Sequence, residues 1–126
     1  MILVFGGAYN GKIKWVKEKY KIEEVDIFYC NSSEIDLSKR VICGLHKFTY
    51  AAGKDSLDPL KILIDNKEIL KDKIIICDEI SSGIVPLKKE ERVWRENTGR
   101  CLQFLSENSN KVYRIFCGLE MVLKDV

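Results

Sequence analysis

Short runs of apolar, mostly β-branched residues recur along the chain, and they limit its fold more than any other feature of the sequence. Each run has the length of a β-strand, and a continuous apolar run is typical of a strand that is covered on both faces. The expected strands are Ile2–Phe5, Val25–Cys30, Arg40–Cys43, Lys73–Cys77 and Val112–Cys117. Strands of this kind belong to sheets that have helices on both sides, so helices are expected between the runs.

The segments between these runs carry the spacing of amphipathic helices. In Lys12–Tyr20 the apolar side chains recur at intervals of three and four residues, and Pro59 suits the first turn of a second helix over 58–70. A third helix is expected over Lys89–Glu107, where the apolar residues form one stripe. Strands that alternate with helices predict an α/β fold with a mostly parallel central sheet flanked by helices.

A glycine-rich stretch after the first expected strand fits the pattern G-x-x-x-x-G-K of phosphate-binding loops. It consists of Gly6, Gly7, Ala8, Tyr9, Asn10, Gly11, Lys12 and Ile13. In such loops the backbone N–H groups and the start of the next helix bind phosphate oxygens, and the lysine reaches the β- and γ-phosphates of GTP or ATP. The stretch therefore predicts a P-loop NTPase-like, nucleotide-binding fold. The alternative is a glycine-rich turn that only joins a strand to a helix.

Ile13 departs from this pattern, because phosphate-binding loops normally carry Ser or Thr at the position after the lysine. The hydroxyl group of that residue binds Mg²⁺, and isoleucine offers no oxygen. Water and the triphosphate can still hold the ion. We therefore expect Ile13 to weaken catalysis more than nucleotide binding.

Two carboxylates, Asp78 and Glu79, directly follow the expected strand Lys73–Cys77. Ligands of open α/β sheets bind at the carboxyl ends of the strands, so either residue can hold Mg²⁺ through water or act as a base. The alternative is that one of them caps the following turn.

The helix expected over Lys89–Glu107 carries several arginines. Arg92 and Arg95 are candidates for nucleotide binding, because a guanidinium group matches phosphate oxygens in a bidentate manner. The alternative, which the spacing alone favours, is a solvated helix face on which neighbouring glutamates balance the charge.

His46 is the only histidine, and it comes soon after the expected strand Arg40–Cys43. A histidine at the carboxyl end of a strand can act as the nucleophile that attacks the α-phosphate of a nucleotide. Lys47 beside it would lower its pKa and favour the neutral, nucleophilic imidazole. A packing or surface role is the alternative, and from the chemistry alone it is the more common one.

Composition narrows the class of partner and the compartment. The net charge of +2 is too small to indicate nucleic acid or an anionic membrane as a partner. The five cysteines are scattered, and no apolar run is long enough to span a bilayer, so we expect a reducing cytoplasm and no structural zinc site. A length of 126 residues suits one domain, residues 1–126.

Together these segments resemble the adenosylcobinamide kinase / adenosylcobinamide-phosphate guanylyltransferase family of cobalamin biosynthesis. The resemblance is densest in residues 79–86, which are similar to the family's N-E-V-G-x-G-I-V-P stretch, and in residues 92–103, which are similar to its R-x-x-R-D-x-x-G-x-x-N-Q helix. Residues 111–124 resemble its closing strands, and residues 2–12 resemble its G-G-A-R-S-G-K-S loop.

The resemblance implies a parallel-sheet nucleotide-binding fold, a homo-oligomer and two activities. Family members phosphorylate the aminopropanol hydroxyl of adenosylcobinamide, and they then transfer GMP from GTP through a guanylylated histidine. By this resemblance His46 would accept GMP, Lys12 would stabilise the transferring phosphate, and Glu79 would position a metal ion or the hydroxyl.

The chain also differs from the family pattern. Tyr9 and Asn10 replace an Arg-Ser pair, Asp78 replaces an asparagine, and only residues 48–72 fill a space in which family members have a further strand and helix. Three functions therefore remain open: an enzyme of this family, a relative that binds a nucleotide or phosphorylated ligand without transferring it, and a non-enzymatic interaction protein.

Overall fold

In the computed structural model, which describes residues 1–80 and 88–126, six strands form one sheet. The strands are β1 (Ile2–Gly6), β2 (Ile27–Tyr29), β3 (Val41–Cys43), β4 (Ile74–Asp78), β5 (Lys111–Phe116) and β6 (Leu119–Asp125). They lie in the order β2-β3-β4-β1-β5-β6, and every neighbouring pair is parallel except β5 with β6. The expected α/β fold with a mostly parallel sheet is confirmed.

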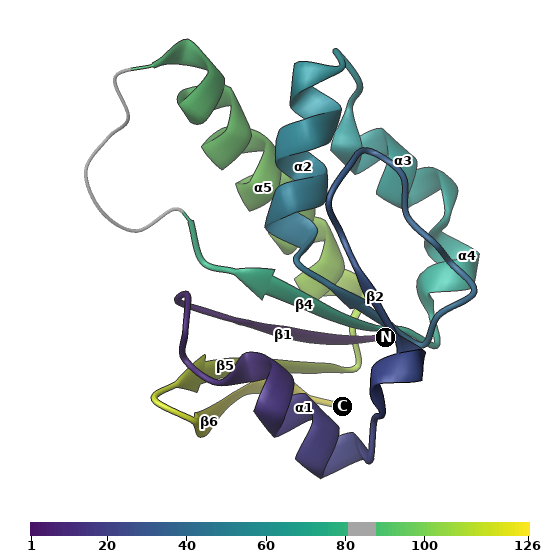
Figure 1. The fold of residues 1–126 in the computed structure, drawn as a ribbon, viewed down its shortest axis with the longest axis vertical. Helices are drawn as coiled ribbons and strands as arrows, with labels where there is room; N and C mark the ends of the chain where they lie inside the picture. Colours follow the sequence, from purple (N-terminus) through teal and green to yellow (C-terminus); the bar gives the residue numbers. More distant parts are fainter. Residues whose placement is uncertain (81–87) are drawn as a thin grey trace.

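Helices cover both faces of this sheet (Figure 1). They are α1 (Lys12–Tyr20), α2 (Leu45–Lys54), α3 (Pro59–Asp65), α4 (Lys67–Leu70) and α5 (Lys89–Asn108), with a 3₁₀ turn, η1 (Glu24–Asp26), before β2. On one face, Val16 of α1 packs with Val4 and Ile76 of the sheet. On the other face, Phe48 of α2 and Leu105 of α5 belong to a second core cluster.

The order of the strands fixes where a ligand can bind. β1 and β4 are neighbours, but the chain leaves β1 toward α1 on one face and β4 toward α5 on the other (Figure 1). In open α/β sheets, ligands bind outside the carboxyl ends of the strands at such a point. The glycine-rich loop that follows β1 and the carboxylates at the end of β4 therefore meet at one edge of the sheet.

The structure corrects two of the expected elements. The helix expected over 58–70 is divided into α3 and α4 at Asn66, whose side-chain amide donates to the carbonyl oxygen of Ile62 over 2.7 Å and competes with helical hydrogen bonds. The strand expected from Val25 starts only at Ile27, because residues 24–26 form η1.

Two further elements, α2 and β6, were not expected from the residue pattern. α2 includes His46 in its first turn, so this histidine belongs to a helix rather than to the end of a strand. β6 is an edge strand on which almost every residue is exposed, and it therefore has no alternation of buried and exposed residues.

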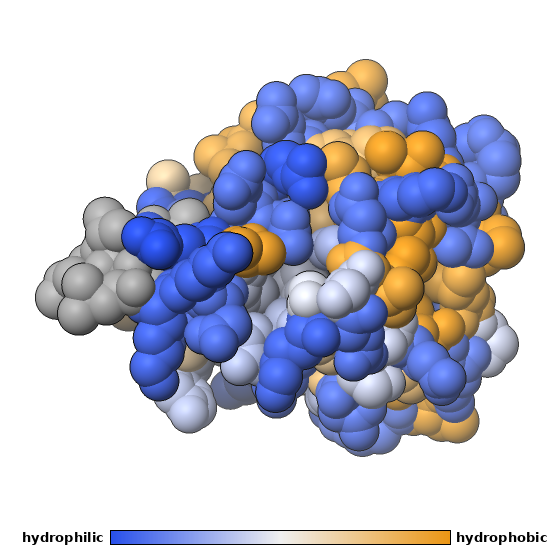
Figure 2. All heavy atoms as spheres, turned by 90° about the horizontal axis from the view of Figure 1, so that it is seen from above, coloured by the Kyte–Doolittle hydropathy of each residue, from blue (hydrophilic) through white to orange (hydrophobic). Residues whose placement is uncertain are grey.

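The face above α2, α3 and α5 is largely hydrophilic, with hydrophobic residues visible between the polar ones (Figure 2). Within residues 1–80 and 88–126, the structure contains no helix with the length and apolar character needed to cross a membrane.

Candidate nucleotide-binding site

A cavity of about 610 Å³ lies where the glycine-rich loop, α1, α2 and the ends of the central strands meet. Lys12, Lys14 and Lys47 line it, and Asp78 is the one carboxylate among its described lining residues. The cavity therefore carries an excess of positive charge, which favours an anionic ligand with several charges.

Two helices begin at this cavity with glycine at the N-cap. Gly11 precedes α1 and Gly44 precedes α2, both have a φ of 82°, and neither helix has a side-chain hydrogen bond at its cap. The first N–H groups of a helix have no partner within the helix, and they carry a partial positive charge. Both helix starts add to the positive potential of the cavity.

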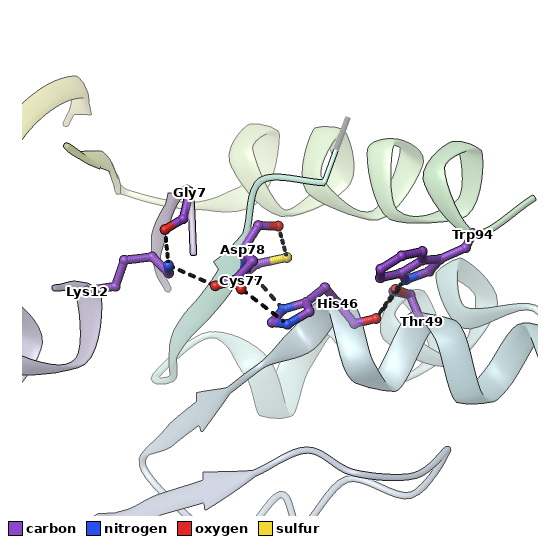
Figure 3. A network of polar contacts seen from close by, with 7 residues as sticks. All are labelled: Gly7, Lys12, His46, Thr49, Cys77, Asp78 and Trp94. Atoms are coloured by element: carbon purple, nitrogen blue, oxygen red, sulfur yellow. Dashed lines mark hydrogen bonds and ion pairs between the residues drawn. The ribbon is translucent and has the colours of Figure 1, made fainter. Parts of the chain in front are cut away.

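The side chain of Lys12 points into this site, toward Gly7 and Asp78 (Figure 3). Its side chain is only 6% exposed, and its ammonium group donates to the carbonyl oxygen of Gly7 over 2.7 Å and lies 2.8 Å from Oδ1 of Asp78. Burying an ammonium group is costly unless it is paired, so these two contacts hold the charge of Lys12 in place. The expected position of Lys12, after a strand and at the start of a helix, is confirmed.

His46 contacts Asp78 through both nitrogens of its ring. The backbone N–H of Asp78 donates to Nδ1 over 3.1 Å, and Nε2 lies 3.4 Å from Oδ2 of the same residue. Because Nδ1 accepts a hydrogen bond, the neutral ring carries its proton on Nε2, facing the carboxylate. In this arrangement neither nitrogen offers a free lone pair to a ligand, and the ring instead orients Asp78.

The surroundings of His46 hold its pKa below its usual range. Burial is the largest cause, and Lys47 and Lys12 act in the same direction, while the charge of Asp78 opposes them. The effect expected of Lys47 is therefore found, although burial contributes more.

Trp94 connects α5 to this group of residues. Its indole N–H donates to the backbone carbonyl oxygen of His46 over 2.8 Å and lies 3.2 Å from the hydroxyl oxygen of Thr49. The Thr49 hydroxyl in turn lies 2.7 Å from that of Thr98 in α5. The sequence pattern placed Trp94 in the apolar stripe of its helix and gave no sign of this polar contact.

The other predicted site residues lie outside the cavity lining. Glu79 accepts hydrogen bonds from Arg114 of β5, over 3.0 Å from Nη2 and 3.3 Å from Nε, a partner that the sequence did not indicate. Arg92 is exposed and Arg95 is half-buried on α5, and neither lines the cavity. Residues 81–87, which include the whole Gly-Ile-Val-Pro stretch (83–86), are outside the described residues.

The side chains at the cavity can bind a metal ion only if a bound ligand supplies most of the atoms that coordinate the ion. In the described part of the chain, no three His, Cys, Asp or Glu side chains cluster as metal ligands would. The side chain of Ile13 packs against the core cluster of Val4 and Val16. Mg²⁺ commonly binds one or two carboxylates together with water and substrate phosphates, so Asp78 fits an ion that arrives with a triphosphate.

Sequence comparison identifies a family for most of this fold. The family model described as cobinamide kinase / cobinamide phosphate guanyltransferase matches residues 51–123 of the 126-residue chain. The matched part extends from the second half of α2 into β6 and includes Asp78 and Glu79. It does not include the glycine-rich loop or His46. No curated protein matches the chain.

Proposed function

We propose that this chain, which belongs to the cobinamide kinase / cobinamide phosphate guanyltransferase family, binds GTP or ATP in the cavity beside Lys12. One observation carries the proposal: the buried ammonium group of Lys12 lies at a cavity that two further lysines line. The N-termini of α1 and α2 lie at the same cavity. A polyphosphate is the ligand that best matches this charge and these open N–H groups. On this proposal residues 1–126 act as one nucleotide-binding domain.

Lys12 has the central part in the proposed mechanism. The triphosphate lies along the loop Gly6–Ile13, and Lys12 exchanges its contact with Asp78 for the β- and γ-phosphates. Its charge then stabilises the γ-phosphoryl group as the bond to GDP or ADP breaks and a bond to the aminopropanol oxygen of adenosylcobinamide forms, with the hydroxyl proton passing to solvent. Asp78 would hold a Mg²⁺ ion, which would neutralise phosphate charge. Arg114 holds the carboxylate of Glu79 in place, and this carboxylate has the role of positioning the aminopropanol hydroxyl.

Titration calorimetry with GTP and ATP, with and without Mg²⁺, tests the binding. A hydrogen bond to a charged group contributes about 1.5–3 kcal/mol, so Lys12→Ala is expected to weaken binding roughly 10- to 100-fold. Lys61→Ala is the matched control, because it removes a lysine from the exposed surface of α3. Binding by Lys12→Ala at wild-type strength, or no binding by the wild-type protein, would show that the proposal is wrong.

GMP transfer through His46 is the second step of the proposal. Because both ring nitrogens contact Asp78, the imidazole must turn away from this residue before a nitrogen can attack the α-phosphate. The bond from that nitrogen to phosphorus forms as the bond to pyrophosphate breaks, and pyrophosphate leaves. Incubation with GTP labelled in the α-phosphate is then expected to give a labelled protein, and His46→Ala is expected to give none.

A relative that binds a nucleotide without transferring it is the second candidate function. The contacts of His46 with Asp78 and the packed, oxygen-free side chain of Ile13 favour it. Nucleotide binding without either a labelled protein or phosphorylation of the cobinamide substrate would identify this case.

A further inference from the structure

Tyr9 has an unusual combination of properties in the glycine-rich loop. Its exposure is 105%, so its ring packs on no other part of the described chain, and yet the residue lines the cavity. Its φ of 61° lies in the left-handed region, which residues with a side chain rarely adopt. The ring therefore contributes no buried surface to the fold, and the backbone beneath it is strained.

Hydrogen bonds of the neighbouring residue, Asn10, hold the loop in place beside Tyr9. The carbonyl oxygen of Asn10 accepts the backbone N–H of Gly118 over 2.9 Å, and its side-chain oxygen accepts the N–H of Cys117 over 3.3 Å. Both partners lie in the turn between β5 and β6. This turn fixes the loop after Tyr9, so the ring is presented at the cavity from a defined backbone position.

A ligand with a planar aromatic group explains these features. An exposed aromatic ring beside a phosphate site can stack on the face of a base, and stacking accepts every base because each has a π-face. We infer that Tyr9 stacks on the base of the nucleotide whose phosphates bind Lys12, an inference that rests on the proposed function. The contact adds affinity for nucleotides over inorganic polyphosphate, and it discriminates little between GTP and ATP.

Calorimetry with three probes separates this contact from phosphate binding. Inorganic tripolyphosphate, GTP and ATP are titrated into the wild-type protein, Tyr9→Ala and Tyr9→Phe. Tyr9→Ala is expected to bind both nucleotides about tenfold more weakly, which is within the range known for base stacking on aromatic residues, and to bind tripolyphosphate as before. Tyr9→Phe keeps the ring and is expected to bind all three probes like the wild type.

Fluorescence gives an independent readout. In Tyr9→Trp, the added indole is expected to be quenched by GTP and ATP but not by tripolyphosphate, because only the nucleotides bring a base. Equal nucleotide affinities for Tyr9→Ala and the wild type would overturn the inference and leave the proposed function standing. An equal loss for nucleotides and tripolyphosphate would overturn it as well, since Tyr9 would then act on the shape of the loop. If the wild type binds none of the probes, both proposals are wrong.

Discussion

The backbone N–H of Asp78 donates to Nδ1 of His46, while the carboxylate of the same residue faces Nε2 of that ring. A single residue of β4 thus contacts both nitrogens of a histidine in α2. The other carboxylate oxygen of Asp78 lies next to the ammonium group of Lys12. Asp78 therefore links the start of α1 to the start of α2, and any ligand that draws Lys12 away also changes the surroundings of His46.

The pKa of His46 can be measured directly, because it is the only histidine in the chain. Proton NMR is expected to give a midpoint below the usual value of about 6.5, since burial disfavours the charged ring. Asp78→Asn is expected to lower the midpoint further, because the charge of Asp78 raises this pKa. A midpoint at or above the usual value in the wild-type protein would contradict the buried contact.

The same shift predicts how stability depends on pH. Since the pKa of His46 is lower in the folded than in the unfolded protein, the unfolded chain binds more protons in the window between the two values. The contribution of His46 to stability is therefore fully present above about pH 6.5 and declines as the pH falls through the lower, folded-state pKa. Urea unfolding at pH 7.5 and 5.5 is expected to show a smaller pH-dependent loss in His46→Gln than in the wild type. Equal losses in the two proteins would exclude this contribution.

Trp94→Phe is expected to loosen the link between α5 and His46. The variant keeps an aromatic ring but loses the N–H that donates to the carbonyl oxygen of His46, so we expect a loss of about 1 kcal/mol in the free energy of unfolding. We also expect the NMR signal and the pKa of His46 to shift, which a loss of packing elsewhere would not cause. Trp15→Phe, on the opposite face of the sheet, is the control and should leave the histidine signal unchanged. An unchanged His46 signal in Trp94→Phe would contradict the link.

The central strands could be predicted because β1 and β4 are buried on both faces and read as continuous apolar runs. α2 was missed, although Leu45, Phe48 and Ala52 stand at intervals of three and four residues and form its buried face. Phe48, Thr49, Tyr50 and Gly53 have weak helix propensity, and they interrupt the better helix formers of this segment and hide the pattern. In α2, packing on α5 and the sheet outweighs the preference of the single residues.

The sequence predicts the local segments that form the site, but it does not predict the contacts between their side chains. A strand, a glycine-rich loop and a lysine at a helix start are local features, so the place of Lys12 follows from the sequence around it. Its pairing with Asp78 depends on the order of the strands, which brings β4 beside β1 although the two are far apart in the chain. The pairing of Glu79 with Arg114 depends in the same way on β5 lying next to β1.

Thiol reagents should distinguish one cysteine from the other four. Cys30, Cys43, Cys77 and Cys101 are buried and Cys117 is exposed. Burial raises the pKa of Cys43 to about 11 and that of Cys30 and Cys101 to about 12, which keeps these thiols protonated and unreactive. Mass spectrometry after brief alkylation of the native protein is expected to show one label, and Cys117→Ser is expected to show none. Two or more labels on the folded wild type would contradict the burial of the other four.

Gly6 and Gly99 should respond in opposite ways to the same substitution. A Cβ atom on Gly6 would lie 2.4 Å from the backbone oxygen of Ile115, a contact that only a shift of β1 against β5 can relieve. Overpacking of this kind typically costs about 1–3 kcal/mol, so Gly6→Ala is expected to lower the free energy of unfolding by that amount. It should also displace the loop that begins at this residue and weaken nucleotide binding.

Gly99 lies within α5 and is exposed, and a Cβ atom there would meet no atom within 4 Å. Because alanine has the higher helix propensity, Gly99→Ala is expected to stabilise the protein by about 0.5–1 kcal/mol. Urea unfolding of both variants measures the two effects on one scale, and GTP titration shows whether only Gly6→Ala affects binding. Equal changes in the free energy of unfolding of the two variants would contradict the close approach of Gly6 in β1 to the backbone of Ile115 in β5. Other contacts would then have to hold the loop that follows Gly6.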